Sequence, residues 1–286
     1  MAGYIIPNMN TRSCEVAFLM QEKIMLWPKP VEGEFQPYLE MYLLEDAAVR
    51  PSGLVLIFPG GGYRYCSPRE SGIIAERFNR LGWHAAVLQY RVAPQVAYPE
   101  PQRDALRAVR IIRSNAEKWG VDKKQIAVLG FSAGGHLAAS CGTIWKEIDS
   151  SAGDAADREE TRPDAMILCY PVINLTRGHA GSGKNLLGKQ EPTFAELERL
   201  DLEKRVSAET PPAFLWHTVT DRLVPYESST LFAEAMWKLG NTAELHMFPR
   251  GAHGLAIGQD NDIVEIRIWP ELASAFLKTV GFVSAK

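Results

Sequence analysis

Residues 125–141 read QIAVLGFSAGGHLAASC, a stretch that predicts a buried strand turning sharply into a helix. Its first half holds a short, continuous apolar run at 126–129, which is typical of a strand buried on both faces of a parallel sheet. Its second half, 133–140, consists of small residues that a helix tolerates. Between them lies Gly130-Phe131-Ser132-Ala133-Gly134, a G-x-S-x-G sequence. We therefore expect Ser132 to lie on the turn between strand and helix.

The expected turn suits a nucleophilic serine. Gly130 and Gly134 remove Cβ atoms that would collide with neighbouring backbone in a cramped turn. The Ser132 Oγ atom would stand above the carboxyl end of the strand, and the N–H of Ala133, at the start of the helix, would point toward an oxyanion formed there. A turn without chemistry is the alternative, since G-x-S-x-G fixes only three positions. The strand-then-helix context favours the nucleophile.

Length, composition and charge narrow the class of protein. A chain of 286 residues with 46% hydrophobic and 23% charged residues can bury a sizeable core, and we expect a single domain over 1–286. The formal net charge of −3 argues against a basic nucleic-acid footprint. No apolar run approaches the roughly 20 residues that span a bilayer. We therefore expect neither a nucleic-acid nor a membrane partner.

The N-terminal residues and the cysteines favour a cytoplasmic location. The first residues, MAGYIIP, lack the basic region and long apolar core of a secretory signal. Cys14, Cys66, Cys141 and Cys169 show no C-x-x-C or metal-finger spacing. Four scattered cysteines in a chain of this length fit a reducing compartment better than a disulfide scaffold.

Apolar strands alternate with helices along most of the chain, which predicts an α/β fold with a mostly parallel sheet covered on both faces. Two earlier strand-like runs, 16–26 and 38–44, predict an antiparallel pair at a sheet edge. The later strands are expected at 54–58, 83–89, 126–129, 164–170, 213–217 and 244–248, and the helices at 71–81, 101–119, 133–140, 227–239 and 262–280, the last interrupted at Pro270.

Two stretches do not follow this alternation. Residues 147–162 are polar and predict an exposed loop. Residues 174–210 contain no clear strand and lie between two predicted strands, on the side where site loops gather. Because long irregular insertions in compact domains are usually functional, we expect a small cap over the site. A solvated excursion without a role is the alternative.

His253 is the best candidate for the base that a serine hydroxyl requires. It lies in RGAHG, 250–254, directly after a predicted strand. His253 is therefore expected at the carboxyl end of that strand, on the same edge of the sheet as Ser132. His217 also ends a strand, but nothing after it fits the acid. His136 lies one helical turn past Ser132 and is expected to pack or hydrogen-bond. His84, His179 and His246 have no supporting pattern.

Asp221 is the candidate acid that would orient His253. It follows the strand 213–217 in a loop, and the chain order of serine, acid and histidine is the one that an α/β-hydrolase requires. A turn or helix-capping carboxylate is the alternative, as is a surface ion pair with Arg222. Asp201 lies in the irregular insertion, which is a poor place from which to orient a ring.

The second oxyanion donor is expected in Pro59-Gly60-Gly61-Gly62-Tyr63, which follows the strand 54–58. Three consecutive glycines are conformationally costly, so they suit a backbone that approaches a ligand closely. We assign the N–H groups of Gly61 and Gly62, with that of Ala133, to the oxyanion. A phosphate-binding loop is the rival interpretation, but the glycine spacing matches neither common motif.

Taken together, these residues resemble an α/β-hydrolase-fold esterase from about residue 50 to residue 280. More narrowly, the chain is similar to bacterial acetyl-xylan and feruloyl esterases, which are related to the hormone-sensitive-lipase-like esterases. The narrower resemblance rests on Ser67 and Glu70 after the three glycines, on Asn185-Leu-Leu-Gly188, and on Pro211-Pro-Ala-Phe214. Pro59 departs from the histidine that the lipase-like group carries before the glycines, which weakens assignment to that branch.

The resemblance implies hydrolysis of short acyl esters, such as acetyl or feruloyl groups on carbohydrates, without a metal or organic cofactor. The sequence leaves open an amide-bond hydrolase, such as an arylformamidase or exopeptidase, because the triad is shared. A non-catalytic protein of hydrolase fold is a weaker alternative, since all three triad residues are present. Aromatic residues that flank the site loops could contact a sugar or simply pack in the core: Tyr63, Tyr65, Tyr90 and Trp216.

Overall fold

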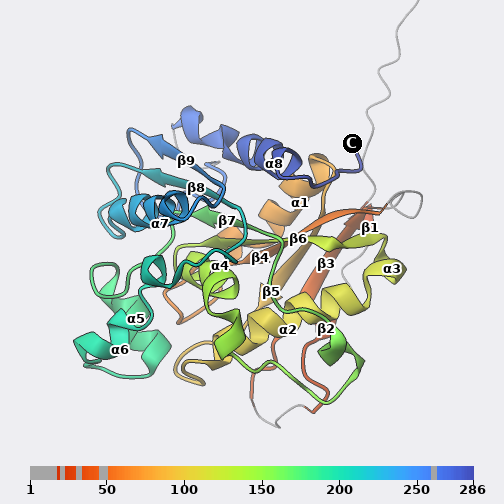
Figure 1. Ribbon diagram of the computed structural model, residues 1–286, viewed down its shortest axis with the longest axis horizontal. Coiled ribbons are helices and arrows are strands. Elements are labelled where there is room, and N and C mark those ends of the chain that lie inside the picture. Colours follow the sequence, from red (N-terminus) through yellow and green to blue (C-terminus); the bar gives the residue numbers. More distant parts are fainter. Residues whose placement is uncertain (1–17, 20–22, 30–33, 45–50, 259–262) are drawn as a thin grey trace, which may run out of the picture.

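The computed structural model describes residues 18–19, 23–29, 34–44, 51–258 and 263–286, and a twisted, mostly parallel sheet runs through their centre (Figure 1). The strands in these ranges are β1 (Phe18–Leu19), β2 (Lys23–Met25), β3 (Tyr38–Leu44), β4 (Ser52–Phe58), β5 (His84–Gln89), β6 (Val121–Phe131), β7 (Ala165–Cys169), β8 (Ala213–Thr218) and β9 (Ala243–Phe248). Their order across the sheet is β1-β3-β5-β4-β6-β7-β8-β9, and β2 also pairs with β3.

The sheet is parallel from β5 to β9 and antiparallel at its N-terminal edge, as the sequence predicted. β1 and β2 run antiparallel to β3, and β3 runs antiparallel to β5. Residues 16–17 and 20–22 of the first predicted strand lie outside the described residues. The chain passes from β4 to β5 on one side and then crosses to β6 on the other. The loops that leave β4 and β6 therefore meet at the point where the strand order reverses, where sheets of this type bind ligands.

Helices cover both faces because the strand residues are apolar on both faces. Alternate residues such as Leu56 and Val128 pack with the helices of one face, and their neighbours such as Ile57 and Leu129 pack with those of the other. The first face carries α2 (Glu100–Ser114), α3 (Ala116–Trp119), α4 (Ala133–Thr143) and α7 (Glu227–Lys238). The second carries α1 (Gly72–Arg80) and α8 (Trp269–Thr279).

Two helix predictions need correction. The helix expected over 101–119 is broken at Asn115, whose side chain donates to the carbonyl of Ile111 (2.9 Å) and so ends α2. The C-terminal helix expected over 262–280 divides into the 3₁₀ segment η6 (Val264–Ile268) and α8. Pro270 lies in the first turn of α8, where its missing N–H costs no helical hydrogen bond.

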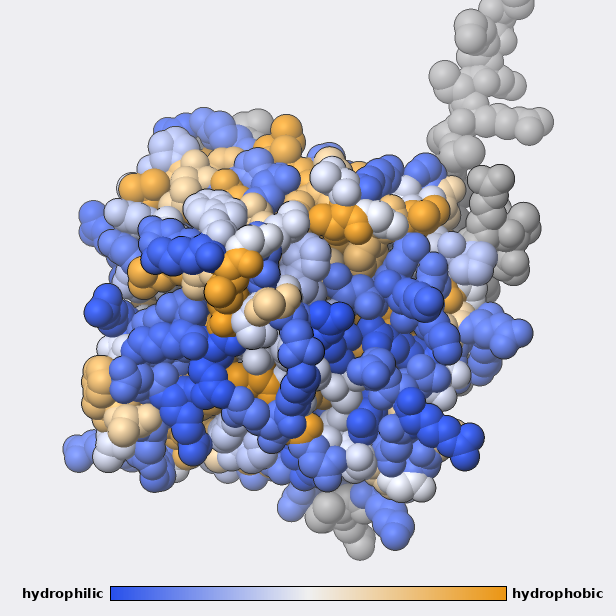
Figure 2. All heavy atoms as spheres, viewed as in Figure 1, coloured by the Kyte–Doolittle hydropathy of each residue, from blue (hydrophilic) through white to orange (hydrophobic). Residues whose placement is uncertain are grey.

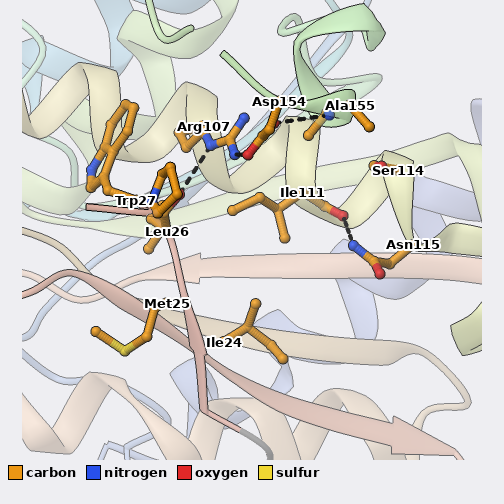
Figure 3. Close-up of a pocket in the computed structure, with 12 residues that line it drawn as sticks. Ile24, Met25, Leu26, Trp27, Arg107, Ile111, Ser114, Asn115, Asp154 and Ala155 are labelled. Carbon is orange, nitrogen blue, oxygen red and sulfur yellow. Dashed lines mark hydrogen bonds and ion pairs between the residues drawn. The ribbon is translucent and has the colours of Figure 1, made fainter. Parts of the chain in front are cut away.

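Most of the polar segment 147–162 lies at the surface, in agreement with the exposed loop predicted from the sequence, and the segment is also anchored to the body of the protein. It contains η4 (Ala155–Arg158), and Asp154 and Asp157 both form ion pairs with Arg107 of α2. The Arg107 side chain is almost fully buried and also donates to the carbonyl of Leu26, at one side of an open pocket of about 580 Å³ (Figure 3). The acidic residues of the segment neutralise a buried cation, which explains their presence there.

The insertion 174–210 has no strand and forms two short helices and a 3₁₀ turn beside α4 (Figure 1). These are α5 (Ala180–Leu187), α6 (Phe194–Glu198) and η5 (Leu202–Arg205). The His136 ring of α4 is hydrogen-bonded to the carbonyl of Leu200 in this insertion (3.0 Å). The other 3₁₀ segments of the described residues are η2 (Pro68–Glu70) and η3 (Trp145–Glu147).

The surface is mostly hydrophilic on the face shown in Figure 2, where apolar residues form small, separate patches. None of the helices in the described ranges combines the length and apolar character that crossing a bilayer requires.

Candidate active site

Ser132 occupies a strained turn between β6 and α4. Its φ of 53° and ψ of −119° lie outside the regions that non-glycine residues normally adopt. A Cβ atom on Gly130 would lie 2.0 Å from the carbonyl oxygen of Gly134, and one on Gly134 would lie 2.2 Å from that of Phe58. These contacts leave no room for a side chain at Gly130 or Gly134. The end of β6, the turn at Ser132 (called the elbow below) and the loop after β4 therefore pack backbone against backbone.

A continuous hydrogen-bonded chain joins Ser132, His253 and Asp221. The Ser132 hydroxyl lies 2.8 Å from Nε2 of His253, and Nδ1 of His253 lies 2.6 Å from Oδ2 of Asp221. The Asp221 carboxylate accepts the Nδ1 proton, which leaves Nε2 to accept the proton of the serine hydroxyl. The structure thus brings together residues that lie 121 and 32 positions apart in the chain, in the geometry that activates a serine.

Asp221 holds both the histidine and its own turn. Its Oδ1 atom accepts the backbone N–H groups of Leu223 (2.9 Å) and Val224 (3.0 Å). Burial would raise the pKa of Asp221, but hydrogen bonds with His217 and His253 outweigh it and hold that pKa well below its usual range. The turn role considered from the sequence is therefore present together with the contact to His253, and Asp221 stays ionised at neutral pH.

The glycine loop after β4 presents free donors beside the serine. A Cβ atom on Gly60 would lie 3.1 Å from Cβ of Ser132, so the loop passes directly beside Ser132. Within the described part of the chain, the N–H groups of Gly61 and Gly62 donate no hydrogen bond. Ala133 is the first residue of α4, where an N–H has no carbonyl one turn earlier to bond. The three donors assigned from the sequence therefore remain available to an oxyanion.

The sequence that carries this site matches a known protein family. The sequence profile of the BD-FAE family matches residues 39–236, which is more than half of the chain. The chain belongs to the BD-FAE family.

Named relatives of this BD-FAE protein include enzymes connected with xylan. It is 40% identical over 230 residues to endo-1,4-beta-xylanase B of Butyrivibrio fibrisolvens, covering 79% of this chain and 36% of that one. It is 32% identical over 215 residues to an acetylxylan esterase of Xylanibacter ruminicola, covering 73% of this chain and 42% of that one. The BD-FAE protein thus spans less than half the length of these two relatives.

A solved structure matches this BD-FAE protein over almost its full length. The acetyl ester-xyloside bifunctional hydrolase from Caldicellulosiruptor lactoaceticus superimposes with a TM-score of 0.86 at 39% identity, covering 93% of this chain and 98% of that one. The expected α/β-hydrolase fold, with antiparallel strands at the N-terminal edge of a mostly parallel sheet, is thereby confirmed.

In this BD-FAE protein, the His217 ring lies against the carboxylate of Asp221. It is completely buried, and its Nε2 lies 3.1 Å from the carbonyl of Val224 and 3.3 Å from Oδ2 of Asp221. Its Nδ1 is paired with the hydroxyl of Ser229 (2.8 Å). Since both ring nitrogens are engaged, His217 contributes to the placement of Asp221 and is not a second candidate base.

His179, for which the sequence offered no pattern, lies beside the site at the start of α5. Its ring approaches to 3.8 Å the position that a Cβ atom on Gly62 would occupy, and its Nδ1 is hydrogen-bonded to Ser182 (3.0 Å). Burial and the neighbouring His253 both lower the pKa of His179. Asn185, six residues further along the chain in α5, donates to the carbonyl of Gly62 (2.8 Å). The insertion therefore contacts the glycine loop directly.

The aromatic residues flanking the site divide sharply by exposure. Tyr63, Tyr90 and Trp216 are buried and belong to the core. Tyr65 has 58% of its surface exposed, so it alone of the four can meet a substrate. An open pocket of about 430 Å³ adjoins His253 and is lined by Thr220, Arg222, Leu223, Gly251, Ala252 and His253. In the described ranges, no cluster of histidine, cysteine or acidic side chains could hold a metal ion.

Proposed function

We propose that the protein is a serine carboxylic-ester hydrolase that removes short acyl groups, chiefly acetyl, from carbohydrates such as xylan fragments. The observation that carries the proposal is the hydrogen-bonded chain from Asp221 through His253 to Ser132. It lies beside the N–H groups of Gly61 and Gly62, which donate no hydrogen bond to any described residue. The names of the relatives, an acetylxylan esterase and an acetyl ester-xyloside hydrolase, support the acetyl group and the sugar.

The reaction follows from the geometry of these groups. Ser132 attacks the ester carbonyl while His253 takes its proton, and the oxyanion is held by the N–H groups of Gly61, Gly62 and Ala133. Asp221, ionised and fixed by its turn, stabilises the imidazolium that forms. His253 then protonates the leaving alcohol, and a water molecule activated by the same ring releases the acyl group from the serine. His253, held in place by Asp221, therefore carries every proton transfer of the reaction.

A substitution of the nucleophile tests the proposal. Ser132→Ala should lower kcat on p-nitrophenyl acetate by about 10⁴-fold or more, because hydroxyl attack is the first chemical step. Circular dichroism should show that the variant stays folded. Near-normal turnover by this variant would exclude Ser132 as the nucleophile.

A substrate series tests the acyl group and the alcohol. Acetylated xylo-oligosaccharides, feruloylated oligosaccharides, formylkynurenine and aminoacyl anilides should be compared by kcat/KM. We expect acetylated xylo-oligosaccharides to give the highest value. Faster cleavage of either amide substrate would instead make the protein an amide-bond hydrolase.

A further inference from the structure

Glu70 is a buried carboxylate that touches the glycine loop. It ends η2, and only 5% of its surface is exposed. The N–H of Gly60 donates to its Oε2 atom (2.8 Å), and the hydroxyl of Tyr170 donates to its Oε1 atom (2.7 Å). A Cβ atom on Gly60 would lie 2.7 Å from Oε2, so the loop is pressed directly against the carboxylate. Both oxygens meet donors, which is the arrangement an ionised carboxylate satisfies.

Tyr170 continues this contact to the loop that carries the histidine. Its hydroxyl oxygen accepts the N–H of Ala256 (3.0 Å), three residues after His253. Its ring meets the His253 ring edge-on, with centroids 4.9 Å apart. The indole N–H of Trp269 donates to the carbonyl of Ala256 (2.8 Å), which fixes the other side of the same peptide segment. Gly60, Glu70, Tyr170 and Ala256 thus form one buried hydrogen-bonded chain.

The charged and titratable groups that face Glu70 come from several elements. Burial raises the pKa of Glu70, whereas its hydrogen bonds to Tyr170 and Gly60 and the nearby His253 and Arg69 lower it, and the result is a raised pKa. Tyr90 and Cys169 also face Glu70, and burial raises the pKa of each. Of these groups, only His253 changes its charge during the proposed reaction. The Glu70 carboxylate and the positive charge that His253 acquires in that reaction therefore attract each other.

We propose that Glu70 and Tyr170 are positioning residues, which hold the glycine loop (59–63) and the loop that carries His253 at a fixed separation. They also place a second carboxylate near His253, since Glu70 is hydrogen-bonded to the tyrosine whose ring meets that histidine. The inference rests on the proposed function, because it concerns the same acyl transfer. Neither residue touches the reacting atoms. Their effect follows from geometry, since oxyanion donors and the base must both be placed to within about 0.5 Å to be effective.

Three substitutions separate the two effects. Tyr170→Phe keeps the ring against His253 but removes the hydroxyl that joins the loops, so kcat should fall about 10- to 100-fold with little change in KM. Glu70→Gln keeps the shape but removes the charge, so kcat should fall and the acidic limb of the kcat/KM profile should move to lower pH. Glu70→Asp keeps the charge but shortens the reach, so kcat should fall while the acidic limb stays in place.

The double variant Glu70→Gln/Tyr170→Phe tests whether the pair acts as one unit. If both residues act through their shared hydrogen bond, the double variant should lose about as much kcat as the more damaged single variant. Losses that multiply would overturn a joint role. Wild-type kcat and an unmoved acidic limb in both folded single variants would overturn the proposal altogether.

A matched control removes a buried hydrogen bond elsewhere. In the wild type, the indole N–H of Trp83 donates to the buried hydroxyl of Ser274 in α8 (2.8 Å). Ser274→Ala removes this acceptor. This variant should melt at a lower temperature with kcat and the pH profile unchanged. If it lowers kcat as much as Tyr170→Phe does, the losses reflect general destabilisation and the proposal fails. Failure of the proposed function is seen separately, as full turnover by Ser132→Ala.

Discussion

We predict that His136 alone makes the protein less stable by about 2 kcal/mol when the pH falls from 7 to 5. The His136 ring is completely buried in α4. Its Nε2–H donates to the carbonyl of Leu200 (3.0 Å), so its Nδ1 must accept the proton of the Tyr63 hydroxyl (2.8 Å). Burial lowers the pKa of His136 to about 4, because the charge of the protonated ring would be cut off from solvent.

The direction and the size of this change in the free energy of unfolding follow from the different pKa of His136 in the folded and unfolded chain. A histidine in an unfolded chain titrates near pH 6.5. Between about pH 6.5 and 4 the His136 ring is therefore protonated in the unfolded chain but neutral in the folded protein. Stability therefore falls as the pH falls through this window and is fully retained above it. Each pH unit inside the window is worth about 1.4 kcal/mol, which gives roughly 2 kcal/mol at pH 5 and about 3 kcal/mol at pH 4.

Urea unfolding of the wild type and His136→Gln at pH 7 and pH 5 measures this effect. Glutamine can donate to Leu200 and accept from Tyr63, but it does not titrate, so the variant should lose about 2 kcal/mol less than the wild type on acidification. His84, which burial likewise brings to a pKa of about 4, is present in both proteins and cancels in the comparison. Parallel losses in the two proteins would refute the argument.

Substitutions at three other residues should give distinct outcomes. Asp221→Asn should keep the fold, because an amide oxygen can still accept the N–H groups of its turn, but should lower kcat about 10⁴-fold by favouring the wrong tautomer of His253; stopped-flow ester hydrolysis measures this. Gly134→Ala should cost at least about 3 kcal/mol, since its Cβ would lie 2.2 Å from a carbonyl oxygen, and thermal melting would reveal the loss. Arg107→Leu should cost about 2 kcal/mol in urea unfolding, because the buried carbonyl of Leu26 loses its donor and Asp154 loses its ion pair, whereas Asp157 keeps Arg110. Its kcat/KM should not change, because the partners of Arg107 include none of the three triad residues; a change in kcat/KM would contradict this.

The central strands and the elbow could be predicted because their signals are local. The apolar run before Gly130 and the small residues after it predict strand and helix within one or two residues of β6 and α4 at the elbow. The break at Asn115 was missed because asparagine also occurs inside helices, and the sequence does not show that its side chain bonds the carbonyl four residues earlier. The role of 147–162 was missed because a polar run gives no sign of a buried cation beneath it.

The sequence predicted the three triad residues and their order along the chain, but it did not predict the roles of the residues that support them. Ser132, Asp221 and His253 each follow a predicted strand, so parallel topology alone brings them to one edge of the sheet. Glu70 and His179 lie in polar or irregular stretches, where a charged residue is ordinarily exposed. Glu70 entered only through a family resemblance, and no pattern marked His179.

Buried polar side chains, more than apolar packing, fix the loops of this site. Loops beyond the ends of strands lose the hydrogen bonds of the sheet, so their backbone groups need side-chain partners when they are buried. Glu70 supplies one to the glycine loop, and the hydroxyl of Thr218 donates to the carbonyl of Gly251 in the histidine loop (2.9 Å). An apolar residue at either position could fill the same volume but could not set the separation of two loops. The polarity of these buried residues is therefore a consequence of where the chemistry is built, and it explains why hydrophobic patterns predict the sheet so much better than the site.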